Sequence, residues 1–520
     1  MNNRFSHFSL FSKLGILIFL MIPAVQSLQA QTIYYVNAAA PGGGDGTSWN
    51  NAIADLQIAL DNACQHTPSS LWVAQGIYYP IQNPSDTSTG PLDRTNTFLL
   101  CNGVSIYGGF AGTETSMAER DWSTYLTVLS GDIDHNDSLS NNTFNVVTCI
   151  HADTTVVLDG FIVTGGFSTT SNNIENQYSG GGMFNINSSP RIKNSIFKDN
   201  MAISGGGMCN NSSAPHLVNC LFQNNMTPEF GTGGGMFNFH SNPILVNCKF
   251  NSNNSGSSGG AIRNLESSIF LDSCLFSGNI SDRGGAMYST TSNNSIHHCQ
   301  FISNTALNDG GALYNITGTQ TELTGCIFSG NDADASGGGM YNSISAQTHM
   351  SECILEGNKA RTGGGINNGD ASVSVFTNSV IRGNSADSDG GGLYCHGSVT
   401  HLINCTISGN ISKSNGGGLY NFSNYIKLIN SNFCGNYAVK DGGALYNRSS
   451  FGPFVTNCIF WNNQVSAGVD VPSASIRNVS GYHPLISYSL VANSGGSSNW
   501  VSDIGDDLHA RVQLLAKQGK

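Results

Sequence analysis

The sequence predicts an all-β repeat protein whose chain winds into a parallel β-helix. Two short sequence elements recur in step with each other through more than half of the chain, with a period near 26 residues. The composition agrees, because 63 of the 520 residues are Gly and only 10% are charged, against about 25% in a typical globular protein. Hydrophobic residues make up 39%, enough to build a core, so an intrinsically disordered chain is excluded.

The first element is Gly-Gly-(Gly/Ala), an aliphatic residue, a variable residue and usually Asn. It occurs eleven times at a spacing of 25 to 28 residues, beginning at Gly180, Gly205, Gly233, Gly259, Gly284, Gly310, Gly337, Gly363, Gly390, Gly416 and Gly442. The second element ends at Asn200, Asn225, Asn253, Asn279, Asn304, Asn331, Asn358, Asn384, Asn410, Asn436 and Asn463. A fixed period of this length is typical of solenoids.

The content of one repeat favours strands over helices. Each repeat holds two or three Gly and short alternating runs of β-branched and aromatic residues, which indicates three short strands joined by tight bends. Such coils stack with parallel strands about 4.8 Å apart. We therefore expect residues 180–465 to form about eleven regular coils, each burying its inner face against its neighbours.

Aligned columns of the repeat predict the core. The residue five positions before each Phe of the second element is always apolar, and we expect this column and the Phe column to point inward. The residue two positions before the Phe is small, namely Cys220, Cys248, Cys274, Cys299, Cys326, Cys353, Cys405 and Cys458, with Ser195, Ser379 and Ser431 in the other coils. We interpret these eight cysteines as stacked thiols, with bridges between some of them as the alternative. The terminal Asn column predicts stacked side-chain amides at a bend.

Two tetrapeptides in these columns carry a family resemblance. GGAI stands at 259–262, and FxxN ends eight of the eleven second elements, for example Phe301 to Asn304. The chain thereby resembles the polymorphic membrane protein repeats of Chlamydia, within the pectin-lyase-like proteins, and its segment 34–63 is similar to the start of secreted Bacteroidetes β-helix proteins. The resemblance implies a single-stranded, right-handed parallel β-helix, and an adhesin at the outer membrane or cell surface.

The two ends of the sequence differ from the repeats. Residues 1–30 read as a signal peptide, with Arg4 and Lys13 before an apolar run at 14–25, so we expect an exported, extracellular or outer-surface protein. The run is too short to span a bilayer, and no later stretch is long enough. Residues 31–179 are predicted to form an N-terminal cap and irregular coils, with a capping helix at 53–63. Residues 466–520 are predicted to hold a final coil and a C-terminal tail.

A column of aromatic residues follows the aliphatic position of the first element. Strand alternation predicts that it points outward, as an exposed ladder able to bind a partner through ring faces. Stacking of neighbouring rings for stability alone is the alternative. The ladder consists of Phe184, Phe237, Tyr288, Tyr314, Tyr341, Tyr394, Tyr420 and Tyr446.

Evidence for catalysis or metal binding in the sequence is sparse. The oxygen ligands of Asp132, Asp134, Asn136 and Asp137 make a candidate calcium site, with a solvated turn as the alternative; no other cofactor is predicted. His216, His349 and His401 share one outward column, but the nearest two are two coils apart, too far for one zinc ion. Asp309, Asp389 and Asp441 are likewise two or three coils apart, beyond the spacing of most catalytic carboxylate pairs.

These observations favour a non-catalytic, exported β-helix that acts in adhesion or in binding a cell-surface glycan or protein. The alternative is a carbohydrate-active enzyme, a polysaccharide lyase or glycoside hydrolase, with its site in the irregular coils between Asp132 and Ser179. The net charge of −12 and the lack of a Lys/Arg cluster argue against nucleic acid as a partner. We expect a monomer.

Overall fold

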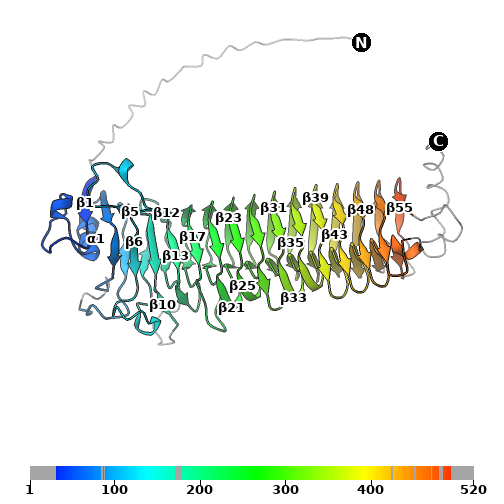
Figure 1. Cartoon of the computed structure of the whole chain (residues 1–520), viewed down its shortest axis with the longest axis horizontal. Coiled ribbons are helices and arrows are strands. Elements are labelled where there is room, and N and C mark those ends of the chain that lie inside the picture. Colours follow the sequence, from blue (N-terminus) through cyan, green and yellow to red (C-terminus); the bar gives the residue numbers. More distant parts are fainter. Residues whose placement is uncertain are drawn as a thin grey trace, which may run out of the picture.

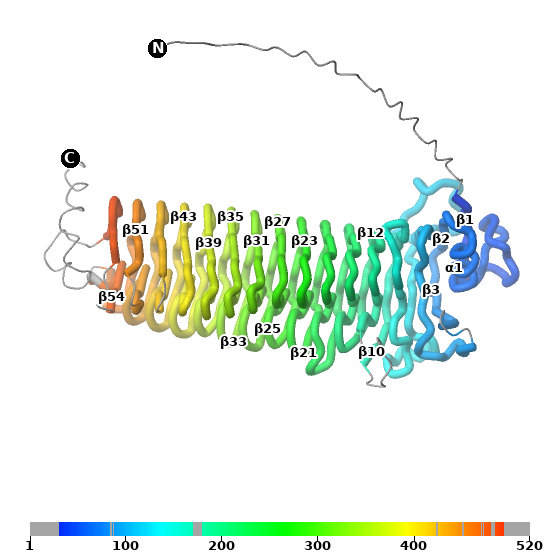
Figure 2. The backbone as a smooth tube through the Cα atoms, turned by 180° about the vertical axis from the view of Figure 1, so that it is seen from behind, coloured from blue at the N-terminus to red at the C-terminus, as the bar shows by residue number. Residues whose placement is uncertain are grey.

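The computed structural model describes residues 31–492, except for 84–85, 87, 170–178, 423–424, 450–451, 470 and 480–483. The chain forms one elongated stack of coils (Figures 1 and 2). Every pairing between its strands is parallel, and the strands make four long sheets and one two-stranded pair. The predicted parallel β-helix is confirmed. The predicted signal peptide and the residues after 492 lie outside the described part.

The four long sheets run along the axis of the stack. They have sixteen strands from β1 (Thr32–Val36) to β55 (Leu485–Ser487), fifteen from β3 (Gly76–Tyr78) to β56 (Leu490–Val491), fourteen from β4 (Phe98–Leu100) to β54 (Ile476–Asn478), and nine from β21 (Asn254–Ser258) to β53 (Gln464–Val465). The short pair is β10 (Phe167–Ser168) with β14 (Met201–Ala202). Four 3-10 turns are described, η1 (Trp49–Asn51), η2 (Met117–Glu119), η3 (Leu139–Asn141) and η4 (Pro472–Ala474).

One regular coil contributes one strand to each long sheet. In the coil that begins at residue 262 these are β22 (Ile262–Leu265), β23 (Ser268–Asp272), β24 (Leu275–Ser277) and β25 (Ile280–Arg283). Our expectation of three strands per coil was wrong for these coils. The fourth strand follows the FxxN asparagine, where the run is short and polar and its buried side chains are small, so that it lacks the hydrophobic signal of a core strand.

Each corner of this coil contains a residue in the left-handed region, which turns the chain between two straight strands. These residues are Glu266 (φ 50°), Ser273 (φ 55°), Gly278 (φ 62°) and Gly284 (φ 63°). After the first three of them comes a residue whose side chain bonds to backbone, namely Ser267, Cys274 and Asn279. At three of its four corners, the repeat therefore combines a left-handed residue with a following residue whose side chain bonds to backbone.

The second glycine of each Gly cluster is required by the close approach of neighbouring coils. A Cβ atom on Gly311 would lie 2.2 Å from the carbonyl oxygen of Gly338 in the next coil. Gly310, just before it, has φ +70° and folds back onto Leu313. The first two positions of the element are therefore restricted to Gly, whereas Ala stands at the third position in coils such as that of Ala312.

The FxxN asparagines form the predicted ladder of amides, and all of them are buried. Asn304 is representative. Its Oδ1 accepts hydrogen bonds from the backbone N–H and the Nδ2 of Asn279, at 3.1 and 2.9 Å, and its Nδ2 donates to the Phe276 carbonyl at 3.0 Å. The same Nδ2 lies 2.9 Å from Oδ1 of Asn331 in the next coil. Each amide therefore joins its own coil to both neighbours.

The Phe column stacks inside the coil, as predicted. Ring centroids are 4.7 to 5.0 Å apart and the rings are within 10° of parallel, from Phe197 through Phe222, Phe250, Phe276 and Phe301 to Phe328. The apolar column five residues earlier is also buried. One continuous core cluster extends from Val36 to Val491.

The eight column cysteines are free thiols, and all are buried. The interpretation as stacked thiols rather than bridges is confirmed. In addition, their sulfur atoms bond to backbone at the corner, which the sequence did not indicate. Cys299 Sγ lies 3.2 Å from the carbonyl oxygen of His297, two residues earlier, and accepts from the backbone N–H of Cys274 at 3.4 Å. Ser379 makes the equivalent bonds to Thr377 and Cys353 at 2.8 and 3.1 Å. Cys and Ser both occur in this column because each supplies a hydrogen-bond donor and an acceptor to the corner.

The N-terminal helix confirms the predicted cap with shifted bounds. Helix α1 spans Leu56–Gln65, and the side chain of its N-cap Asp55 accepts from Gln57 N–H at 2.7 Å. Ile53 lies before the helix, in a bridge with Val36. The buried face of α1, including Leu56 and Leu60, joins the main core.

A disulfide, which the sequence did not indicate, links the end of α1 to the first coils. It joins Cys64 to Cys101, whose Cα atoms are 5.9 Å apart. In the irregular coils, residues 157–164 form two strands, β8 (Val157–Asp159) and β9 (Phe161–Thr164). The left-handed Gly160 turns the chain between them.

The corner bonds predict unequal effects of two substitutions at Cys299. Cys299→Ser should change the free energy of unfolding by less than about 1 kcal/mol, because Ser supplies the same donor and acceptor. Cys299→Ala leaves the buried N–H of Cys274 without its acceptor, so it should cost about 1 to 3 kcal/mol. Urea denaturation measures both, with Cys434→Ala, a substitution outside the corner column, as control. Equal stability of the Ser and Ala proteins would contradict this role.

Candidate functional site: the outer faces of the solenoid

The predicted aromatic ladder lies on the fourteen-stranded sheet. Its residues pair coil by coil in one column, which runs through β11 (Met183–Ile186), β18 (Met236–Phe239), β26 (Met287–Thr290), β30 (Leu313–Ile316), β34 (Met340–Asn342), β42 (Leu393–His396), β46 (Leu419–Phe422) and β50 (Leu445–Arg448). Centroids of the tyrosine rings are 4.6 to 5.1 Å apart within two runs, 288–314–341 and 394–420–446. The register prediction is confirmed.

The expected exposure of this ladder is not found throughout. Phe184, Tyr314 and Tyr420 are only 4%, 8% and 6% exposed, and the other five members are half-buried. Stacked rings cover each other's faces, and the Gly corner folds back against the ring, since a Cβ on Gly310 would lie 3.0 Å from the Cβ of Tyr314. The prediction of exposed ring faces was therefore wrong for these three residues, and binding by the ladder remains a prediction.

Burial also shifts the acidity of the ladder. Desolvation, aided by the neighbouring Tyr420 and Asp389, raises the pKa of Tyr394 to about 12. The pKa of Tyr314 and of Tyr341 is also raised, mainly by burial. Between Phe237 and Tyr288 the column holds Arg263, whose guanidinium lies 4.1 Å from the ring centre of Tyr288 in a cation–π contact. The ladder thus has the contacts of a structural stack.

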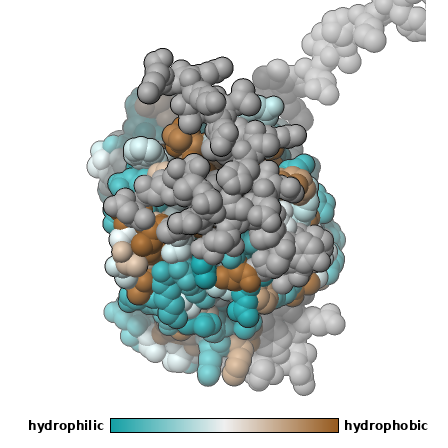
Figure 3. Space-filling model, turned by 90° about the vertical axis from the view of Figure 1, so that its right-hand side faces the viewer, coloured by the Kyte–Doolittle hydropathy of each residue, from teal (hydrophilic) through white to brown (hydrophobic). Residues whose placement is uncertain are grey.

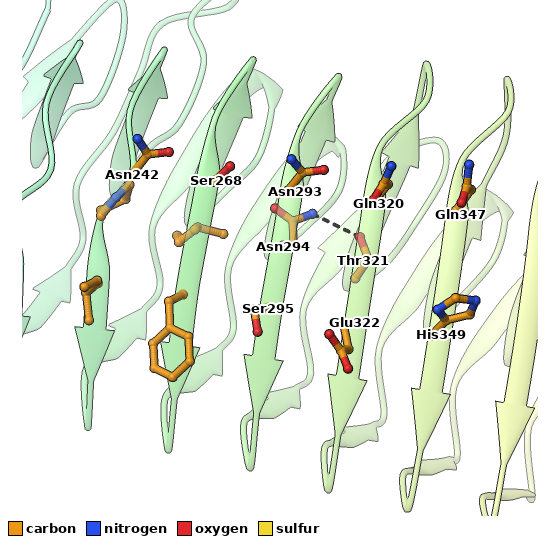
Figure 4. Close-up of a pocket in the computed structure, with 14 residues that line it drawn as sticks. Asn242, Ser268, Asn293, Asn294, Ser295, Gln320, Thr321, Glu322, Gln347 and His349 are labelled. Carbon is orange, nitrogen blue, oxygen red and sulfur yellow. Dashed lines mark hydrogen bonds between the residues drawn. The ribbon is translucent and has the colours of Figure 1, made fainter. Parts of the chain in front are cut away.

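A shallow groove of about 460 Å³ crosses five strands of the sixteen-stranded sheet (Figure 4). The strands are β19 (Ile244–Val246), β23, β27 (Asn293–His297), β31 (Gln320–Thr324) and β35 (Gln347–Ser351). Sequence analysis did not identify it. Its upper border in Figure 4 is a row of one polar side chain per coil, Asn242, Ser268, Asn293, Gln320 and Gln347, which we name the amide row.

The amide row is exposed and unpaired. All five side chains are exposed, and within the described residues none of them makes a hydrogen bond to another protein group. Elsewhere, outward asparagines in successive coils do pair, as Asn404 does with Asn378 at 3.1 Å. The free donors and acceptors of the amide row are therefore available to a ligand.

The groove floor combines apolar and ionisable side chains. Ile244 and Phe270 are 43% and 38% exposed on adjacent strands. Along the same column follow Ser295, Glu322 and His349. Glu322 and His349 thus face solvent side by side on β31 and β35. The histidine column predicted from the sequence contributes His349 alone to this groove.

The candidate calcium loop satisfies most of its own oxygens, but Oδ1 of Asp134 is buried without a hydrogen-bond partner among the described residues. Asp132 accepts hydrogen bonds from the backbone N–H groups of Asn136 and Asp137, both at 3.2 Å. Asp134 accepts from the side-chain amides of Asn136 and Asn141, at 2.8 and 3.0 Å. In the part of the chain that the structure describes, no group of three or more His, Cys, Asp or Glu is placed to hold a metal ion. The loop thus has most of the bonds of a solvated turn, and calcium binding stays a prediction.

The proposed enzyme region between Asp132 and Ser179 is described only in part. Its clearest electrostatic feature is a buried ion pair, in which Arg120 lies 2.8 Å from Asp159 and also donates to the Asp159 carbonyl. Both groups are engaged in holding adjacent coils. Burial raises the pKa of Asp309, a member of the Asp column, but no second carboxylate accompanies it in the adjoining coils of that column.

A second asparagine ladder, inside the coil, was also missed. The last residue of the Gly element points inward on the fourteen-stranded sheet, and Asn185 donates to Asn210 at 2.8 Å, as Asn210 does to Asn238. Strand alternation could have revealed it, since this residue follows the inward aliphatic residue by two positions. It stabilises the sheet beneath the aromatic ladder.

Comparisons with known proteins agree with the fold. The model of the Chlamydia polymorphic membrane protein (Chlamydia_PMP) repeat matches residues 298–316. No curated protein sequence matches the chain significantly. No helix in the described residues is long and apolar enough to cross a membrane.

Three solved structures resemble the chain at low identity. Pectate lyase Pel9A is 14% identical over 83% of this chain and 79% of its own, with a TM-score of 0.28. The A-module of mannuronan C-5 epimerase AlgE6 of Azotobacter vinelandii is 10% identical over 88% and 99%, with a TM-score of 0.28. A rhamnogalacturonan lyase is 13% identical over 92% and 90%, with a TM-score of 0.24. Nothing about activity follows from likeness at this level.

The raised tyrosine pKa predicts a pH dependence of stability. A tyrosine whose pKa is about 10 when unfolded and about 12 when folded contributes stability that is fully present below pH 10 and lost as the pH rises through 12. Tyr394→Phe should therefore lose less stability between pH 10 and pH 12 than the unchanged protein. Thermal unfolding at a series of pH values measures this, with Tyr425→Phe as control. An identical alkaline loss in all three proteins would contradict it.

Proposed function

We propose that this protein is an exported, non-catalytic β-helix that binds a cell-surface glycan or protein through the groove on its sixteen-stranded sheet. The observation that carries the proposal is the amide row, in which five exposed polar side chains lie on successive coils with no partner in the described residues. Four unpaired amides and the Ser268 hydroxyl, at a regular spacing of about 4.8 Å, present a repeated set of donors and acceptors. A flat, rigid sheet orients them without a loop that must first be ordered.

Three further features support export to the surface. Residues 1–30 have the pattern of a signal peptide. The Cys64–Cys101 disulfide is of the kind that persists in oxidising compartments. The match at residues 298–316 is to a repeat of a polymorphic membrane protein. Adhesion at the outer cell surface is the role that combines these features with the groove.

A specific observation also favours a second function, that of a carbohydrate-active enzyme. Glu322 and His349 occupy paired positions on β31 and β35 within the groove. Side chains of these two types serve as general acid and base in many hydrolases and lyases. Neither makes an ion pair in the described part of the chain, so both are free to meet a substrate. This arrangement replaces the irregular coils as the place to test for catalysis.

Binding and catalysis can be separated with labelled protein. The protein should bind intact cells, and the double substitution Gln320→Ala/Gln347→Ala should weaken that binding at least about ten-fold without changing thermal stability, because two free amides are lost. Gln300→Ala, which removes an exposed amide from the fifteen-stranded sheet, is the matched control and should bind normally.

The contradicting results are equally specific. Binding that is unchanged by the double substitution would exclude the groove as the binding site. Release of reducing or unsaturated ends from a polysaccharide, abolished by Glu322→Gln, would show that the protein is an enzyme instead.

A further inference from the structure

We infer that the ligand of the groove is an uncharged, extended glycan that runs along the axis of the solenoid. This inference rests on the function proposed above and goes further by specifying the ligand class. It depends on three properties of the groove, namely its charge, its apolar floor and its repeat along the axis.

The charge of the groove disfavours an acidic ligand. The five strands that form it contain no Lys or Arg, and the ionisable groups facing its centre are Glu322 and His349. Asp272, on β23 beside the groove, adds a second carboxylate, whose oxygen lies 3.1 Å from Nδ1 of His298. A polyuronate or a sulfated glycan needs cationic partners or bound cations to offset repulsion, and the described residues show no metal-binding cluster. The groove therefore matches a polymer that carries hydroxyl groups but no carboxylates.

The apolar floor matches the face of a sugar ring. Phe270 is 38% exposed and Ile244, on the adjacent strand, is 43% exposed. An exposed aromatic ring beside unpaired amides offers apolar stacking on one side of a sugar and hydrogen bonds to its hydroxyls on the other. Figure 4 shows the labelled amides of Asn293, Gln320 and Gln347 along one border, one on each successive coil.

The repeat explains why an extended chain fits better than a single sugar. The amide row covers five coils, about 19 Å along the axis at the usual strand spacing. This length is several sugar rings long, and each ring would meet a polar side chain, an amide on four coils and the Ser268 hydroxyl on the fifth. Affinity should therefore increase with chain length up to the length of the groove, as expected when adjoining sites act together.

The experiment measures binding of neutral and acidic oligosaccharides to the full chain by calorimetry. The neutral set contains β-glucan, xylan and mannan oligosaccharides, and the acidic set contains oligogalacturonates and oligoalginates. We expect a neutral oligosaccharide to bind, its hexamer more tightly than its dimer, with little effect of salt. Phe270→Ser should weaken this binding at least about ten-fold. The matched control is Phe454→Ser, which alters a ring 36% exposed on the same sheet, outside the groove.

Each other outcome decides between the two proposals. Tighter binding of acidic oligosaccharides, weakened by Phe270→Ser, would overturn the uncharged ligand and leave the binding groove intact. The protein could instead bind cells but neither set of oligosaccharides, and lose cell binding on Gln320→Ala/Gln347→Ala. That result would indicate a protein partner and overturn the inference of a glycan ligand. Equal oligosaccharide binding by the Phe270→Ser and Phe454→Ser proteins would show that the ligand does not bind in this groove.

Discussion

Hydrogen bonds between asparagine side chains at one corner of each regular coil, from Asn200 to Asn463, hold these coils in register. Each amide bonds both to neighbouring backbone and to the amides of the adjacent coils. An amide buried without partners would cost free energy, so a coil that slipped by one residue would lose several bonds at once. The Phe stack and the Cys/Ser corners follow the register that this ladder sets, because they occupy fixed positions relative to it within each repeat.

The same chemical group serves two purposes in the molecule. Inside the coil and at its corners, amides are paired along the axis and contribute stability. On the sixteen-stranded sheet, the amide row has the same spacing but no hydrogen-bond partner among the described residues. A solenoid that repeats its coil every 26 residues or so presents its outward positions as a regular grid. Binding would then depend on which outward columns are left unpaired, and stability on those that are paired.

Figure 3, which faces one end of the rod, shows hydrophobic residues only scattered among hydrophilic ones.

Most of the fold could be predicted from the sequence because the same pattern of residues occurs in eleven successive repeats. The inward columns and the FxxN ladder were found by alignment of the repeats alone, and the capping helix by the helical spacing of apolar residues at 53–63. The fourth strand of the coil was missed because its short runs, such as Ile280–Arg283, lack a hydrophobic core pattern. The Cys64–Cys101 disulfide lies outside the repeats, where no column fixes the partner of a cysteine.

The site was harder to predict than the fold. Outward direction could be read from strand alternation, but exposure could not, and Tyr314 and Tyr420 point outward yet are buried by neighbouring rings and by the Gly corner. The groove depends on side chains that differ between coils, such as Ile244, Phe270 and Glu322, so the repeat does not mark it. Only the three-dimensional register brings these positions together on one sheet.

The stability of Asn304→Ala tests most directly whether the corner ladder holds the solenoid in register. This substitution removes the acceptor for the backbone N–H and Nδ2 of Asn279. It also removes the donor to the Phe276 carbonyl and to Oδ1 of Asn331. It should lower the free energy of unfolding by at least about 3 kcal/mol, since several buried groups lose a partner together. Asn432→Ala, at an exposed strand position, should stay within about 0.5 kcal/mol of the unchanged protein. If urea denaturation found the two variants equally stable, the ladder would not be the interaction on which the structure depends.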